Sequence, residues 1–347
     1  MLTAGLIIIF LIVLLGPFAN RRIERNLEAF LFLMGLISST VSNVWSVDLV
    51  HEGFVAPINI TVAVLGAGVL FHYLRTRIDA GMQILLNRVS LSRIVCFGII
   101  VLGLLSSFIS AIIAALILVE FINVLPLHRR AEINLTVIAC FAIGLGAALT
   151  PLGEPLSTIT VSKLHGPPHH ATFFYLAKLL GFYTVAAIIV LGILGVFLVR
   201  SSPEDVEETL SGEVIEQGVK DVFVRAFKVY VFVMALIFLG AGFKPLIDAY
   251  LTKAPSLALF WANIVSAILD NATLAAAELG PALSDDQIKS ALLGLLIAGG
   301  MLIPGNIPNI ISAHALRIRS TEWARVGVPL GFGLMLFTML LLMAGLI

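Results

Sequence analysis

The sequence predicts an all-α polytopic membrane protein built from two inverted repeats, each with a re-entrant hairpin and a helix broken at proline and glycine. Composition, long apolar runs and an internal repeat predict it. Of the 347 residues, 59% are hydrophobic and 12% are charged, whereas about 25% are charged in soluble domains. Lys plus Arg and Asp plus Glu number 21 each, so no basic excess is available for nucleic acid. The composition excludes a soluble enzyme, a disordered chain and a nucleic-acid-binding protein.

Long apolar runs predict the membrane helices, because a helix needs about 20 apolar residues to cross a bilayer. These runs cover 2–19, 28–47, 54–74, 132–164, 171–199, 223–243, 287–314 and 322–347. Three arginines, Arg21, Arg22 and Arg25, follow the first run. A signal peptide carries its positive charge before its apolar core. The order found here therefore predicts a first membrane helix whose amino end lies outside the cell.

Two further runs, 94–126 and 255–282, are too long for one straight helix and short for two crossings. Each has polar residues at its centre, and non-helical backbone at membrane depth persists only where protein or a water-filled cavity surrounds it. We therefore expect re-entrant hairpins, with single crossings as the alternative. Hairpins leave 16 of the 21 Lys and Arg residues in cytoplasmic segments, and single crossings leave 14. The positive-inside rule thus favours hairpins and a multi-pass protein of the cell (inner) membrane with both termini outside.

An internal repeat connects the two halves of the chain. The segment that begins at Ser106 resembles the one that begins at Ala262, in an alignment that pairs Ser110 with Ser266. A Gly-rich stretch broken at proline follows each of them, and such interrupted helices in two halves indicate a transporter binding site. The expected division is an N-terminal helix and loop, a first repeat, a cytoplasmic linker and a second repeat, at 1–27, 28–199, 200–222 and 223–347.

Asp270 is the strongest candidate for chemistry, because it lies in the middle of an apolar run. A carboxylate at membrane depth costs about 2.5–3.5 kcal/mol even on lenient insertion scales. A cation or proton site is the functional interpretation, and Asn271 beside it offers a neutral oxygen of the kind that hard cations accept. The alternative is a structural carboxylate that caps a hairpin helix.

Glu154 is the second candidate, since it follows Pro151 and Gly153 and precedes Pro155 in a stretch that cannot stay helical. Such a break frees backbone carbonyls for a cation, although Glu154 could also simply cap the next helix. The predicted ion- and proton-binding residues are Asp270, Asn271, Glu154, Ser266, Thr150, Asn306, Asn309, Ser157 and Ser110. Asp270 and Glu154 are the expected Na⁺ ligands, and we expect them to meet at one midplane cavity between the repeats.

These motifs resemble the ion transporter superfamily, and most nearly the sodium/proton antiporters of the NhaD type and related cation transporters. The resemblance covers roughly residues 90–199 and 223–347, and it implies inverted repeats and a homodimer. The acidic Asp-Asn hairpin motif of the family falls on Asp270 and Asn271, and its Pro-x-Gly-Asp/Glu loop falls on Pro151, Gly153 and Glu154. This chain departs from the family at Ala114-Ala115, where the first hairpin has no acidic-amide pair.

The predicted function is secondary active exchange of a monovalent cation, with Na⁺ favoured, for H⁺. Desolvation favours the protonated form of a buried carboxylate, whereas Na⁺ needs it ionised, so one site that takes either ion gives exchange. The expected partners are the lipid bilayer and a small inorganic cation, with no enzymatic activity and no cofactor besides the transported ions. The alternative is an Na⁺- or H⁺-coupled symporter of organic acids or inorganic anions. A non-transporting membrane subunit or receptor is a third possibility, against which the repeat argues.

Overall fold

The computed structural model describes residues 2–20, 22–23, 26–55, 88–200, 219–250 and 255–344, with single residues and pairs between 57 and 73. Within these ranges the secondary structure is helical, without strands. The helices are α1 (Leu2–Ala19), α3 (Leu27–Val41), α5 (Leu91–Ile109), α6 (Ala111–Val124), α7 (Arg129–Ala147), α8 (Pro155–Lys163), α9 (Tyr175–Arg200), α11 (Val219–Tyr250), α12 (Ser256–Ala262), η1 (Asn263–Ala267), α13 (Asn271–Glu278), α14 (Asp285–Met301), η2 (Ile303–Gly305), α15 (Ile307–Ala315) and α16 (Ser320–Met343).

Five of the described helices are long and apolar enough to cross a membrane, and they lie in α5, α7, α9, α11 and α16. This confirms the prediction of an all-α, multi-pass membrane protein. The expected helix at 28–47 ends earlier, at Val41, because the chain turns at Asn43, where φ is 53°. About half of the expected helix at 54–74 and most of the linker at 200–222 lie outside the described residues.

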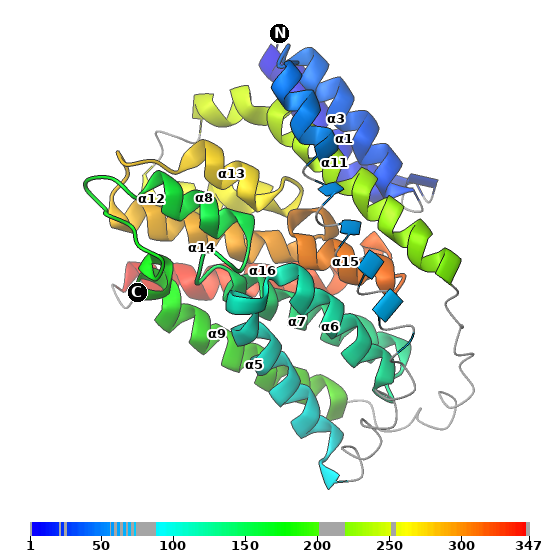
Figure 1. Cartoon of the computed structure of the whole chain (residues 1–347). Helices are drawn as coiled ribbons and strands as arrows, with labels where there is room; N and C mark the ends of the chain where they lie inside the picture. The colour runs from blue at the N-terminus through cyan, green and yellow to red at the C-terminus, as the bar shows by residue number, and fades with distance from the viewer. Residues whose placement is uncertain are drawn as a thin grey trace.

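The centre of the bundle is formed by α7 and α14, whose side chains are buried along most of their length. Around α7 lie α5, α6, α9 and α15, and Figure 1 shows the two broken segments crossing the middle of the molecule. In contrast, α5, α9 and α16 expose large apolar side chains, such as Phe97 at 70%, Phe182 at 82% and Phe337 at 57%. Such an apolar exterior suits contact with lipid tails.

The expected helix breaks are present. The run 132–164 divides into α7 and α8 around the loop Thr150–Glu154, and the run 287–314 divides into α14, η2 and α15. Pro155 and Pro308 lie in the first turns of α8 and α15, where a proline leaves no helical hydrogen bond unmade. The run 94–126 divides at Ser110 into α5 and α6, and α5 alone has 19 residues, enough to cross a membrane.

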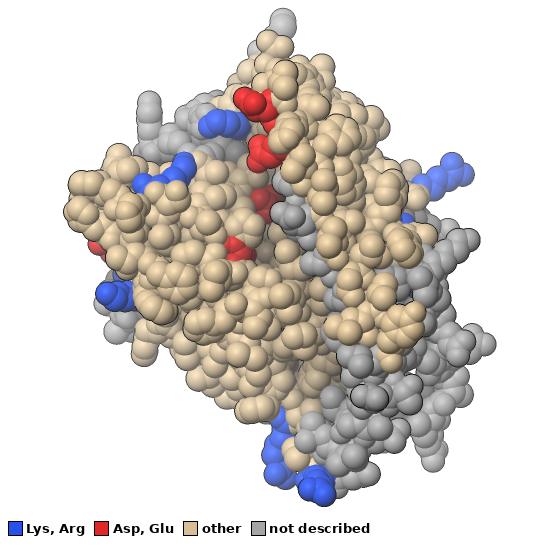
Figure 2. Space-filling model, in the orientation of Figure 1, with Lys and Arg blue, Asp and Glu red and all other residues tan. Residues whose placement is uncertain are grey.

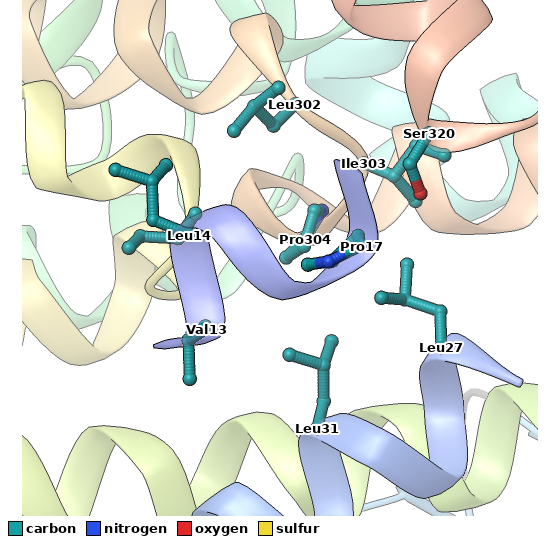
Figure 3. A pocket seen from close by; sticks show the side chains of 10 residues that line it. Val13, Leu14, Pro17, Leu27, Leu31, Leu302, Ile303, Pro304 and Ser320 are labelled. Atoms are coloured by element: carbon teal, nitrogen blue, oxygen red, sulfur yellow. The ribbon is translucent and has the colours of Figure 1, made fainter. Parts of the chain in front are cut away.

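A third group of helices, α1, α3 and α11, packs together on one side of the bundle (Figure 1). Hydrogen bonds from Ser39 to the carbonyl of Phe238 and from Ser42 to that of Gly242 hold α3 against α11. Figure 3 shows a small apolar pocket of about 20 Å³ where α1 and α3 approach the break between α14 and α15.

Two ends of the bundle can be defined by their contacts. At the first, which we call the Arg129 end, the guanidinium of Arg129 donates to the carbonyls of Leu316 and Arg317 at 2.8 and 2.9 Å. At the other, the Asp285 end, a carboxylate oxygen of Asp285 lies 2.9 Å from Nδ1 of His169. Because α7 begins at the Arg129 end and α14 begins at the Asp285 end, the two central helices enter the bundle from opposite sides.

Candidate functional site

Four short helices begin at one cavity. A cavity of about 550 Å³ is lined by residues from the first turns of α6, α8, α13 and α15, and one wall is formed by α11. The residues concerned are Ile112, Pro155, Ala272, Thr273 and Ile307. Unpaired backbone N–H groups make the amino end of a helix partly positive. Four partly positive helix ends therefore meet at the cavity, two from each half of the chain.

Hydrogen bonds fix the loop that carries Glu154 against the start of α6. The backbone N–H of Ala111 donates to the carbonyl of Gly153 at 2.7 Å. The hydroxyl of Thr150 donates to the carbonyl of Ser107, whose own hydroxyl donates to the carbonyl of Gly146 at 2.7 Å. Thr150 is thus a structural contact between the two segments as well as a neighbour of the site.

Asp270 lines the cavity at the amino end of α13. Its Oδ2 accepts hydrogen bonds from the backbone N–H of Thr273 at 2.9 Å and from the hydroxyl of Thr273 at 3.1 Å. The carboxylate is therefore the N-cap of α13, as the structural alternative expected. Because Asp270 also faces the cavity, capping leaves it in a position to meet a small ion.

Glu154 is the N-cap residue of α8 by position, but its carboxylate makes no capping hydrogen bond. The side chain is 6% exposed, and its Oε1 has no hydrogen-bond partner among the described residues. It lies beside Asn271 and within electrostatic range of Asp270. The fold thus brings together two carboxylates that are 116 positions apart in the chain.

Most of the remaining expected ligands are buried, and three of them donate to backbone carbonyls. Ser157 donates to Ala147 at 3.3 Å and Ser266 to Leu295 at 3.1 Å. The Nδ2 of Asn309 donates to the carbonyls of Gly299 and Leu302 at 2.8 and 2.9 Å, and its Oδ1 has no partner among the described residues.

Asn306, at 3% exposure, is the N-cap residue of α15, and its amide lies against Gly144 on α7. Ser110 caps α6 by accepting from the backbone N–H of Ile113 at 3.4 Å. These two residues mark the starts of two of the four helices at the cavity. The side chain of Ser110 caps its helix, whereas that of Asn306 makes no capping hydrogen bond.

The sequence reasoning missed two charged residues that line the same cavity, Glu52 and Lys244. Lys244 belongs to α11, and the available signal was its place beside Pro245 just past the apolar run 223–243. Figure 2 shows acidic side chains in a row along a hollow of the surface. Among the described residues, no group of three or more His, Cys, Asp or Glu side chains could hold a metal ion.

One family model matches this chain over residues 3–344, and its description is "Protein of unknown function (DUF1646)". No curated protein matches the chain.

Proposed function

Because the chain belongs to the DUF1646 family, whose function is unknown, we propose a function from the geometry of the site. We propose that the protein is a secondary active transporter that exchanges a monovalent cation, Na⁺, for H⁺. The observation that carries this proposal is the proximity of Glu154 to Asn271 and Asp270, together with the position of Asp270 in a cavity where helices from both halves of the chain begin.

The chemistry of the pair supports exchange. Two neighbouring buried carboxylates repel each other when both are ionised, and burial favours their neutral forms, so they hold a proton readily. A sodium ion would need the same oxygens ionised, together with neutral oxygens such as that of Asn271. Oε1 of Glu154, which lacks a protein partner among the described residues, is the oxygen open to either ligand. Binding of H⁺ and of Na⁺ would then exclude each other.

Corresponding contacts in the two halves support the inverted repeat. Ser106 donates to the carbonyl of Ile143 at 3.0 Å, as Ser266 does to that of Leu295 at 3.1 Å. Ser157 and Asn309 each donate to a carbonyl ten residues earlier in the chain.

The helix caps of the two halves also correspond. Ser110 accepts from the N–H three residues on, as Asp270 does. This favours a register that pairs Ser106 with Ser266 and Ser110 with Asp270, in place of the Ser110–Ser266 pairing read from the sequence. In that register the first half has a serine where the second has the carboxylate. The two helix pairs around these caps, α5–α6 and α12–α13, would be the re-entrant hairpins, although α5 alone is long enough to cross a membrane.

Symport of an anion is the second candidate, and one specific observation favours it. Lys244 lines the cavity, and helix amino ends attract anions. Two of the four helices at the cavity, however, have a carboxylate at the N-cap position, Glu154 in α8 and Asp270 in α13. These negative charges offset the positive helix ends and disfavour an anion, so cation exchange stays the first proposal. The proposal also includes a homodimer, which the resemblance to the ion transporter superfamily implies, in the inner membrane.

The test is sodium-driven pH change in proteoliposomes, followed with an internal pH dye. We expect Asp270→Asn to abolish exchange, because the variant loses the titratable charge. Asparagine is also a good N-cap, so α13 should still begin at the same residue and the protein should fold. We expect Glu154→Gln to slow exchange, but not to abolish it as Asp270→Asn does.

Thr273→Val is the matched control, since it removes the hydroxyl that binds Asp270 but keeps the carboxylate. It should retain exchange. Folded Asp270→Asn protein that exchanges at the wild-type rate would refute the proposal. Uptake of a labelled dicarboxylate or inorganic anion driven by Na⁺ would instead support symport.

A further inference from the structure

A further buried carboxylate, Glu278, lies at the end of α13, away from the cavity. Thr273 and Ala276 of α13 line the cavity. Glu278 is two positions beyond Ala276 and therefore projects from the opposite side of the helix. Its side chain is 4% exposed. It lies beside Asn263, the first residue of η1, which is fully buried. The pair thus connects the start of η1 with the end of α13.

The pair has more acceptors than donors. Neither carboxylate oxygen of Glu278 has a hydrogen-bond partner among the described residues, and the same holds for Oδ1 of Asn263. The amide Nδ2 of Asn263 has two hydrogens, and one of them is used in donating to the carbonyl of Ala291 on α14 at 3.1 Å. The second hydrogen can serve at most one oxygen of Glu278. The three unpartnered atoms can only accept when the carboxylate is ionised. An ionised, unpaired carboxylate at this burial would be costly.

The charged groups on neighbouring elements have other contacts. On α8, the ammonium of Lys163 donates to the carbonyls of Ala276 and Leu279 at the end of α13. In the first turns of α14, Lys289 lies 3.9 Å from Asp286, and Asp285 contacts His169 and Tyr175. On α11, Lys244 faces the cavity. A proton is the smallest addition that supplies the missing donor.

We propose that Glu278 is a second proton-binding site of the protein, which holds a proton in this conformation beside the buried amide of Asn263. The proton removes the charge of Glu278, so that no ionised carboxylate stays buried without a partner. The site goes beyond the proposed exchange and does not depend on it. It gives α13 a titratable group at each end, Asp270 at the cavity and Glu278 at the Asp285 end.

The test is infrared spectroscopy of the full-length protein in lipid vesicles at neutral pH, with ¹³C-labelled glutamate side chains. We expect the wild-type spectrum minus that of Glu278→Gln to contain the carbonyl band of a protonated carboxylic acid. The band should move in D₂O, because the proton is exchangeable. Bands of an ionised carboxylate in its place, with or without Na⁺, would overturn the proposal.

Two further variants test the role of Asn263 and provide a control carboxylate. Asn263→Ala leaves Glu278 in place but removes its polar neighbour, so the acid band should persist and move to higher frequency. An unmoved band would overturn the assignment of Asn263, and this comparison holds even where Glu278→Gln folds poorly. Glu132→Gln is the matched control. Because Glu132 pairs with Arg129 at 2.8 Å, it should lose only ionised-carboxylate bands. None of these spectra needs an ion gradient. A negative spectroscopic result can therefore be told apart from an absence of exchange activity.

Discussion

At the scale of single residues, Ser110 has the most unusual backbone near the site, with φ 71° and ψ 150°. Positive φ is uncommon outside glycine and costs about 1–3 kcal/mol. Ser110 turns the chain between α5 and α6, so that the next N–H, that of Ala111, reaches Gly153. We expect Ser110→Gly to keep the free energy of unfolding or raise it by about 1 kcal/mol, and Ser110→Val to lower it by about 1–3 kcal/mol. Thermal unfolding in detergent measures both.

Ser90 provides the matched control for that prediction. It is the N-cap residue of α5 but makes no side-chain capping hydrogen bond, and its φ of −62° and ψ of 143° are ordinary for a side chain such as valine. Ser90→Val should change the unfolding free energy by about 0.5 kcal/mol or less. Equal losses for valine at both positions would show that the conformation of Ser110 is not the cause.

At the scale of elements, the packing of α5 on α7 depends on glycine. A Cβ on Gly146 would overlap the carbonyl of Gly103 and lie 2.8 Å from Oγ of Ser106. Close approach of two helix backbones through small residues is typical of membrane proteins. We therefore expect Gly146→Ala to push α5 and α7 apart and to lower the free energy of unfolding by about 1–3 kcal/mol. Thermal unfolding in detergent, with exchange activity as a second readout, measures this loss.

Gly181 on α9 is the matched control, because a Cβ there would meet nothing within 4 Å. Gly181→Ala should stabilise the protein by up to about 1 kcal/mol, since alanine is the better helix former. If both alanine variants behave alike, the contact between Gly103 and Gly146 does not limit the approach of the helices.

At the scale of the whole molecule, the two ends of the bundle should face opposite sides of the membrane. Arg129 and Arg130 follow the positive-inside rule when the Arg129 end is cytoplasmic, which places Asp285 and Asp286 outside. Arg130 is exposed, and Asp286 is 85% exposed. We expect a single cysteine at Asp286 to react with an impermeant reagent in right-side-out vesicles. A cysteine at Arg130 should react only after permeabilisation.

These positions are better probes than Arg129, whose guanidinium holds the carbonyls of Leu316 and Arg317. Reaction of both cysteines from the same side would contradict an opposite placement of the two ends. Reaction in the reverse order would keep that placement and invert the protein in the membrane.

The sequence by itself determined the features that depend on local composition. Runs of about 20 apolar residues define membrane helices because each buries its own backbone polar groups. Prolines and glycines define breaks because they act on the residues beside them, and the breaks before Pro155 and Pro308 lie where the sequence predicted. Asp270 and Glu154 were identifiable because charge is costly in an apolar run.

Only the tertiary structure decided which of these local features meet. Contact between Glu154 and Asn271 needs two segments more than 100 positions apart to pack side by side, and no local pattern encodes that distance. Lys244 became a cavity residue through the packing of α11, and Glu278 gained Asn263 through the fold of 256–278. Hydropathy reports how deep a residue lies in the membrane, whereas its neighbours depend on helix contacts that form only when the whole chain is packed.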